Sequence, residues 1–160
     1  MSRSLGPALP PDLLERLSQR DLAARLGTAI PVVTLDPQGR PHPMLCSHLE
    51  VLAVDPTSIR LVIAAGGRSA ANLEARGLAT LLIVEPGCTV YVKCRAGGPP
   101  MRQQDLERFD LRVEDVLEDA PADWEGGPGI TSGIRYGPTP TLEEPWAKAT
   151  LALLRSDRAG

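Results

Sequence analysis

Apolar segments rich in β-branched residues follow one another from residue 29 to residue 96, and short turns separate nearly all of them. Turn sequences such as DPQG at 36–39 and DPTS at 55–58 fit tight connections between antiparallel strands. Between the third and fourth segments, GGRSAANLEARG at 66–77 has the composition of a helix. A parallel sheet would need such a crossover after nearly every strand. The pattern therefore predicts a mainly β fold with flanking helices, built around an antiparallel barrel or sandwich.

The remaining segments complete a single predicted domain over residues 1–160. Residues 1–9 show no periodicity and are predicted to be flexible. A helix is expected after Pro10, with a break at Ser18–Asp21, where S-x-x-D has the form of a capping box. A C-terminal helix is expected within residues 138–160, because Leu142, Trp146, Ala149 and Leu153 share one helical face. We expect six strands, at 29–35, 40–54, 59–65, 79–85, 89–96 and 109–113.

Charge and composition exclude several classes of function. The chain has 160 residues with 17 basic and 20 acidic side chains, and its net charge of −3 argues against nucleic acid or a membrane surface as a partner. Many of the acidic residues fall in the stretch 101–125, which we expect to be mostly solvated surface. The longest apolar runs are too short to span a bilayer. Three cysteines without a CxxC spacing favour a reducing compartment, so the sequence predicts a cytoplasmic protein.

The helical segment at 66–77 has residues that suit an anion. If Ser69 is the N-cap, the first free backbone N–H groups lie at residues 70–72, and Gly77 ends the helix. Arg68 adds a charged fork of donors, and Asn72 adds an amide. These groups together predict a binding site for a phosphate monoester. The alternative is structural: a glycine turn, a helix cap and a solvated arginine account for the same residues.

The strand HPMLCSHLEVLAV offers a second surface. Alternation places His42, Met44, Cys46 and His48 on one side, and it places the side with Leu45, Ser47, Leu49 and Val51 in the core. Because a strand spreads the two histidines over about 20 Å, they do not predict a metal site. The sequence also has no GxSxG elbow, GxGxxG or Walker loop, so no catalytic residue is assigned. The polar face is expected to lie against a partner or a ligand.

The order of these motifs resembles a known family. GTAIPVVTLDPQGRPHP, MLCSHLEVLAVDPTSIRLVIA, GGRSAANLEARGLATLLIV and YVKCRA are similar, in pattern and order, to the split-barrel flavoproteins related to pyridoxamine 5'-phosphate oxidase. The resemblance covers residues 20–96 best and implies an antiparallel six-stranded split β-barrel. It implies that Arg68, Ser69 and Asn72 contact the phosphate of flavin mononucleotide (FMN). It also implies that Met44, Leu45, Cys46 and Ser47 pass along the isoalloxazine ring.

The same resemblance implies a function and an assembly. Members are usually homodimers that hold the flavin in the subunit interface, so this chain is expected to be an FMN-dependent oxidoreductase acting on a small molecule. The chain departs from many members in having Ser69-Ala70 where they have Ser-Lys or Thr-Lys. An alternative is a non-catalytic dimer that binds flavin or haem, with His42 or His48 as an axial ligand. A further alternative is a structural dimer with an empty barrel.

Overall fold

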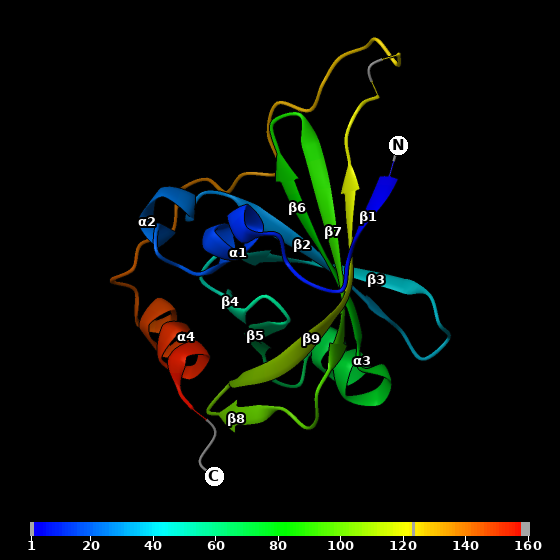
Figure 1. The fold of residues 1–160 in the computed structure, drawn as a ribbon. Coiled ribbons are helices and arrows are strands. Elements are labelled where there is room, and N and C mark those ends of the chain that lie inside the picture. Colours follow the sequence, from blue (N-terminus) through cyan, green and yellow to red (C-terminus); the bar gives the residue numbers. More distant parts are fainter. Residues whose placement is uncertain (1, 123, 158–160) are drawn as a thin grey trace.

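The computed structural model describes residues 2–122 and 124–157, and in this part of the chain it shows a nine-stranded antiparallel sheet with four helices. Figure 1 shows a strongly curled sheet, with α1, α2 and α4 to one side and α3 at the opposite side. The elements, in chain order, are β1 (Ser2–Gly6), α1 (Pro11–Leu17), α2 (Leu22–Arg25), β2 (Ala29–Leu35), β3 (Pro41–Ser47), β4 (Val51–Asp55), β5 (Ser58–Ala64), α3 (Arg68–Arg76), β6 (Leu78–Glu85), β7 (Cys88–Ala96), β8 (Met101–Gln103), β9 (Leu106–Asp119) and α4 (Pro145–Arg155).

Strand β9 joins the two halves of the sheet. Along its 14 residues it pairs with β5, β1, β7 and β8, and the continuous strand order is β3-β2-β6-β7-β9-β5-β4. The register of β7 against β9 shifts between Lys93 and Cys94, which is a β-bulge. A bulge increases local twist and bends a strand, so it helps the sheet to curl. In Figure 1, β9 runs along the length of the barrel.

The core is aliphatic and lies inside the curled sheet. Alternate residues of each central strand are fully buried there, including Val32 of β2, Leu81 of β6, Val92 of β7 and Val116 of β9. Leu13 and Leu17 of α1 belong to the same cluster. Val33 of β2 and Leu82 of β6 are apolar residues on the opposite face of the same strands, where they are only half-buried. The strands nearest β3 thus carry apolar side chains on both faces.

The predicted fold class is confirmed, and the structure corrects several boundaries. Residues 2–6, predicted to be flexible, form β1 and pair with β9. The acidic stretch 101–125 contains all of β9, so it is not mostly solvated surface: the strand expected at 109–113 is longer, and within it buried Phe109, Leu111 and Val113 alternate with less buried polar residues. The single strand expected at 40–54 is two strands, β3 and β4, separated by a turn at 48–50.

The helices follow the sequence with smaller changes. The predicted break near Ser18 is present, but the capping box does not form: the Ser18 hydroxyl donates to the carbonyl of Glu15, and Asp21 makes no side-chain cap. The C-terminal helix is α4, and residues 158–160 of the predicted range lie outside the described residues. Within the part of the chain that is described, no helix is long and apolar enough to cross a membrane.

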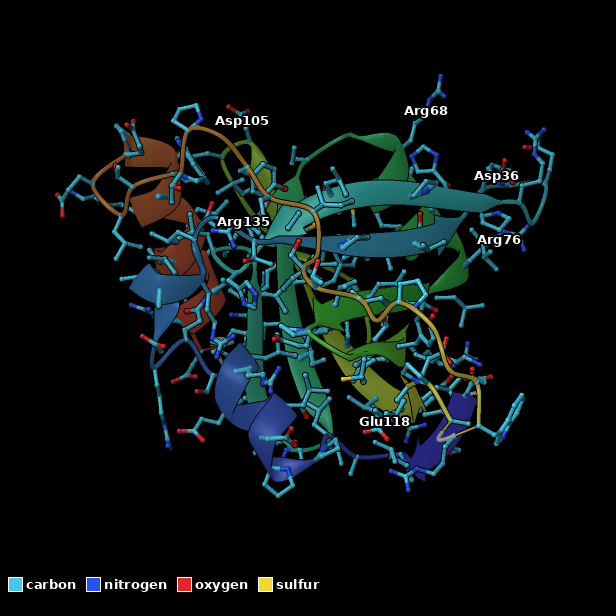
Figure 2. The ribbon with its side chains drawn as sticks, turned by 90° about the horizontal axis from the view of Figure 1, so that it is seen from above. Asp36, Arg68, Arg76, Asp105, Glu118 and Arg135 are labelled. Atoms are coloured by element: carbon cyan, nitrogen blue, oxygen red, sulfur yellow. The ribbon has the colours of Figure 1, made fainter. Side chains whose placement is uncertain are left out.

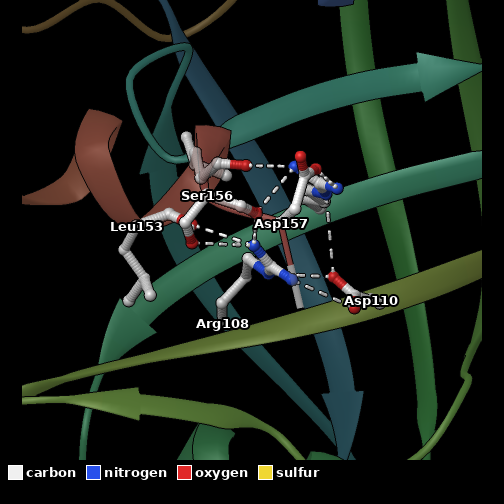
Figure 3. A network of polar contacts seen from close by, with 7 residues as sticks. Arg108, Asp110, Leu153, Ser156 and Asp157 are labelled. Carbon is white, nitrogen blue, oxygen red and sulfur yellow. Dashed lines mark hydrogen bonds and ion pairs between the residues drawn. The ribbon is translucent and has the colours of Figure 1, made fainter. Parts of the chain in front are cut away.

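Two arginines of the sheet hold the C-terminal end of α4. Arg108 of β9 is fully buried, donates to the carbonyls of Leu153 and Ser156, and lies 3.0 Å from a carboxylate oxygen of Asp110. Arg60 of β5 donates to the carbonyls of Leu154 and Ser156 at 2.9 and 3.1 Å. Figure 3 shows this network around the end of the helix. The last carbonyls of a helix have no partner within the helix, and here the guanidinium groups supply the missing donors.

Candidate functional site

The start of α3 presents free backbone donors, although they differ from the predicted ones. The helix begins at Arg68 after Gly67, so the free N–H groups belong to residues 68–70 rather than 70–72. Ser69 is therefore not the N-cap: it lies in the first turn, is 9% exposed, and its hydroxyl has no hydrogen-bond partner among the described residues. Gly77 ends the helix as predicted, with a φ of 67° that glycine adopts without strain.

A groove of about 330 Å³ lies between this helix and the turn that joins β2 to β3. Its walls are formed by Asp36, Pro37, Gln38, Arg40, His42, Arg68, Ala71 and Asn72. Figure 2 shows Arg68 projecting from the start of α3 at the same end of the molecule as Asp36. A volume of this size is at the small end of the range for ligand sites in proteins.

The positive charge of the groove comes mainly from Arg68. Arg40 is paired with Asp36, whose carboxylate also accepts the backbone N–H groups of Gln38 and Arg40. The hydrogen bond from the Arg40 backbone, together with the Arg40 side chain, lowers the pKa of Asp36, so this carboxylate stays ionised. Arg68 is exposed and has no ion-pair partner among the described residues. Its guanidinium is therefore free to bind an anion.

Asn72 has a structural role in this groove. Its amide donates to Thr34 Oγ1 at 3.0 Å, and the Thr34 hydroxyl donates to the carbonyl of His42 at 3.3 Å. Both Thr34 and Asn72 are buried. This chain of hydrogen bonds fixes α3 against β2 and β3, and so it holds Arg68 near His42.

The residues predicted to follow the isoalloxazine ring lie on β3, but on two faces. Cys46 is 1% exposed within the core cluster and Met44 packs against that cluster, whereas Leu45 points outward and is 51% exposed. The expected assignment of faces was therefore wrong within β3: the side with Met44 and Cys46 faces the core. The turn after Ser47 explains the error, because β4 begins a new alternation and places Val51 in the core independently of Leu45.

Ser47 and Cys46 have protein partners already. The Ser47 hydroxyl donates to Glu50 at 2.9 Å and accepts the N–H of Leu49 at 3.2 Å, which closes the turn between β3 and β4. The carbonyl of Cys46 accepts the hydroxyl of Tyr136 at 3.1 Å. Burial raises the pKa of the Cys46 thiol well above its ordinary value, so the thiol stays protonated and is a poor nucleophile.

The structure thus brings the two halves of the predicted site to different places. Arg68 and Asn72 line the groove, while Met44, Leu45, Cys46 and Ser47 do not. Arg40 is a functional candidate in the groove that sequence reasoning did not assign, and His42, considered from the sequence only as a haem ligand, lies there too. The hairpin sequence DPQGRPH carried the signal, since its turn returns both residues toward α3. In the described chain, no three His, Cys, Asp or Glu side chains gather where they could hold a metal ion.

Comparison with known proteins supports the fold. No family model matches the chain. An uncharacterized protein, YclD of Bacillus subtilis strain 168, is 28% identical over 149 residues, covering 89% of this chain and 94% of YclD. Such a match indicates that the similarity extends over nearly the whole domain.

Solved structures share the fold at lower sequence identity. A candidate pyridoxamine 5'-phosphate oxidase from Lactobacillus delbrueckii superimposes with a TM-score of 0.56 at 14% identity, over 71% of this chain and 98% of that one. HutZ, a haem storage protein of Vibrio cholerae, superimposes with a TM-score of 0.50 at 16% identity, over 74% of this chain and 99% of HutZ. The chain therefore has the split-barrel fold of the pyridoxamine 5'-phosphate oxidase-like proteins.

Proposed function

We propose that this protein is a homodimeric flavoprotein that binds FMN and acts as an oxidoreductase on a small molecule. The observation that carries the proposal is the guanidinium of Arg68, which has no ion-pair partner among the described residues and lies beside the free N–H groups of α3. Helix N-termini and arginine forks are the donors that phosphate groups prefer. The bound flavin supplies the electron-transfer chemistry, and the chain supplies the means of holding it.

The phosphate end of the cofactor is proposed to bind beside Arg68 at the start of α3. Arg68 and the backbone N–H groups of residues 68–70 are the donors, whereas Ser69 is buried and does not line the groove. Ala70, which departs from the lysine of many family members, is 1% exposed and faces the core. Because a lysine at this position would point inward, we expect Arg68 to supply the positive charge that binds the phosphate.

The ring end requires a second subunit. In one chain Leu45 is exposed on β3, and β3 lies at the end of the strand order, with its outer edge unpaired within the described sheet. The neighbouring outward faces of β2 and β6 carry Val33, Leu35 and Leu82, so an apolar surface extends from Leu45 across three strands. A second copy of the chain packed on this surface would form the other wall for a flat, apolar ring.

The test begins with the visible spectrum of the purified protein, before and after FMN is added and the excess removed. Flavin bands that stay with the protein in a one-to-one ratio are expected. Titration then compares Arg68→Gln with Arg20→Gln, which removes an exposed charge outside the groove. Loss of a charge-assisted hydrogen bond costs about 1.5–3 kcal/mol, so FMN affinity should fall about ten- to hundredfold in Arg68→Gln alone.

Riboflavin provides the matched ligand, because it has the same ring and no phosphate. Its affinity should be equal in the original protein and in Arg68→Gln. An equal loss of affinity for FMN and riboflavin would show that Arg68 does not bind the phosphate. Absence of retained flavin in every sample would overturn the flavoprotein proposal itself.

One observation favours haem as a second candidate ligand. His42 lines the groove and is only half-buried, and HutZ, which shares the fold, is a haem storage protein. His48 is unsuited to this role, because it is 5% exposed and faces a pocket of about 180 Å³. A Soret band that disappears in His42→Ala would select haem over flavin.

A further inference from the structure

A second pocket, of about 180 Å³, lies where the end of β3 meets the segment 131–135. It is polar, and its lining includes Arg25, Thr28, His48, Glu85, Ser132 and Arg135. Figure 2 shows Arg135 beside the end of β3 that is remote from Asp36. Since β3 has seven residues, this pocket is about 20 Å from the groove at the start of α3.

His48 is a buried polar side chain without a partner. Only 5% of the residue is exposed, it lines the pocket, and its ring has no hydrogen-bond partner among the described residues. The ring nitrogens are not sealed inside the protein, so they can meet water or a ligand that enters the pocket. Burial and the charge of Arg25 lower its pKa to about 4, so the ring is neutral at pH 7 and can donate one hydrogen bond.

The two arginines also have unused donors. Arg25 Nε is buried without a hydrogen-bond partner among the described residues. Its Nη1 lies 3.8 Å from an oxygen of Glu85, and Arg16 approaches the same oxygen at 2.7 Å. Arg135 has no ion pair in the described chain, and its guanidinium lies over Gly27, where an added Cβ would come within 3.2 Å of Nη2. Glycine at position 27 therefore leaves the space that this guanidinium occupies.

We propose that this pocket binds the carboxylate group of a small monoanionic ligand through Arg25, Arg135 and His48. The charges of its lining support one negative charge: Arg25 and Arg135 contribute two positive charges, Glu85 contributes one negative charge, and His48 is neutral. Arginine forks bind carboxylates through two parallel hydrogen bonds. The volume is that of about six water molecules, which admits a carboxylate carried by a short chain.

The site stands apart from the proposed flavin phosphate site. Where FMN binds as proposed, its ring would extend along β3 toward this pocket, and the pocket would hold the carboxylate of the substrate; only this last step rests on the proposed function. Carboxylate binding by itself needs no flavin. The two sites can therefore be tested separately.

Titration with propionate, followed by NMR of the two histidine side chains, tests the proposal. Propionate at millimolar concentration should shift the His48 ring signals and raise the pKa of His48, because a bound anion favours the imidazolium. Propionamide, which has the same shape and no charge, should leave them unmoved. His42 provides an internal reference: inorganic phosphate should move the His42 signals if the groove binds phosphate, and a failure there concerns only the flavin site.

Two variants complete the test. Arg135→Gln, on an exposed segment, should weaken propionate binding by about tenfold, whereas Arg20→Gln should leave it unchanged. Arg25→Gln should give the same loss as Arg135→Gln, and circular dichroism checks that each variant is folded. The proposal is overturned if propionate leaves His48 unmoved or acts no better than propionamide. A stronger effect of phosphate than of propionate on His48 would refute the assignment to carboxylates.

Discussion

The buried state of His48 makes the stability of this protein depend on pH in a predictable direction. The imidazole has an ordinary pKa of 6.5 that falls to about 4 in the folded chain, because burial disfavours the charged ring and Arg25 repels it. The unfolded chain therefore binds a proton more readily than the folded chain. The free energy of unfolding should be unaffected by this group above pH 6.5 and should fall as the pH drops toward 4.

The difference of 2.5 pKa units between 6.5 and about 4 corresponds to about 3 kcal/mol when the loss is complete. At pH ~4.5 the same relation gives about 2.5 kcal/mol. Replacing His48 with Gln removes the titrating group. Urea denaturation should show that the original protein loses about 2.5 kcal/mol more than His48→Gln between neutral pH and pH ~4.5.

The comparison of two pH values makes the assay specific. Any fixed cost of placing Gln at position 48 cancels, and the carboxylates that titrate in the same range, including Glu50, are present in both proteins. His42→Gln, which alters a half-buried histidine in the groove, serves as the control and should keep the full pH dependence. The buffers must contain no carboxylate, since the proposed ligand would itself raise the pKa of His48. Parallel pH profiles for His48→Gln and the original protein would refute the reasoning.

Two further predictions concern the arginines at the end of α4 and the proposed dimer. Arg108→Met should lower the free energy of unfolding by about 3 kcal/mol, measured in urea, because it removes the Arg108 hydrogen bonds to the carbonyls of Leu153 and Ser156 and leaves Asp110 without its nearest cation. The Ser156 carbonyl keeps its bond from Arg60, so a change below about 1 kcal/mol would show that Arg60 is enough to hold α4. If the protein is the proposed dimer, light scattering should give the mass of a dimer for the original protein and of a folded monomer for Leu45→Asp, because the change places a charge within the proposed apolar interface. A dimer mass for both proteins would place the interface elsewhere.

The sequence predicted the elements whose hydrophobic pattern is strong and local. Strands β2, β5, β6 and β7 appear within a residue or two of their expected positions, because their apolar runs end at Pro, Gly or Asp turns. The start of β9 was harder to read, because its charged residues Glu107 and Arg108 are buried beside Phe109 and hide the apolar alternation that marks a strand. An acidic composition therefore did not mean that this stretch is solvated surface.

The turn at 48–50 shows why the candidate ring site was only partly predictable. No Gly or Pro marks it; the carboxylate of Glu50 replaces them by accepting the backbone N–H and hydroxyl of Ser47. Burial raises the pKa of this carboxyl, and the two hydrogen bonds oppose that rise. A turn made by one side chain leaves the alternation of the sequence apparently unbroken, and the expected core face was consequently reversed for Leu45.

The pocket around His48 could not be predicted from the sequence for a different reason. Its polar groups come from α2, from the turn after β3, from the end of β6 and from the segment that follows β9, so no local pattern of residues contains them. They meet because segment 134–136 bonds to the start of β2: Ala29 donates to the carbonyl of Ile134, and Tyr136 donates to the carbonyl of Gly27. The same segment anchors Tyr136 on Cys46 of β3. A ligand bound to Arg135 would therefore lie next to a segment that is hydrogen-bonded to β3, the strand that the flavin ring is proposed to follow.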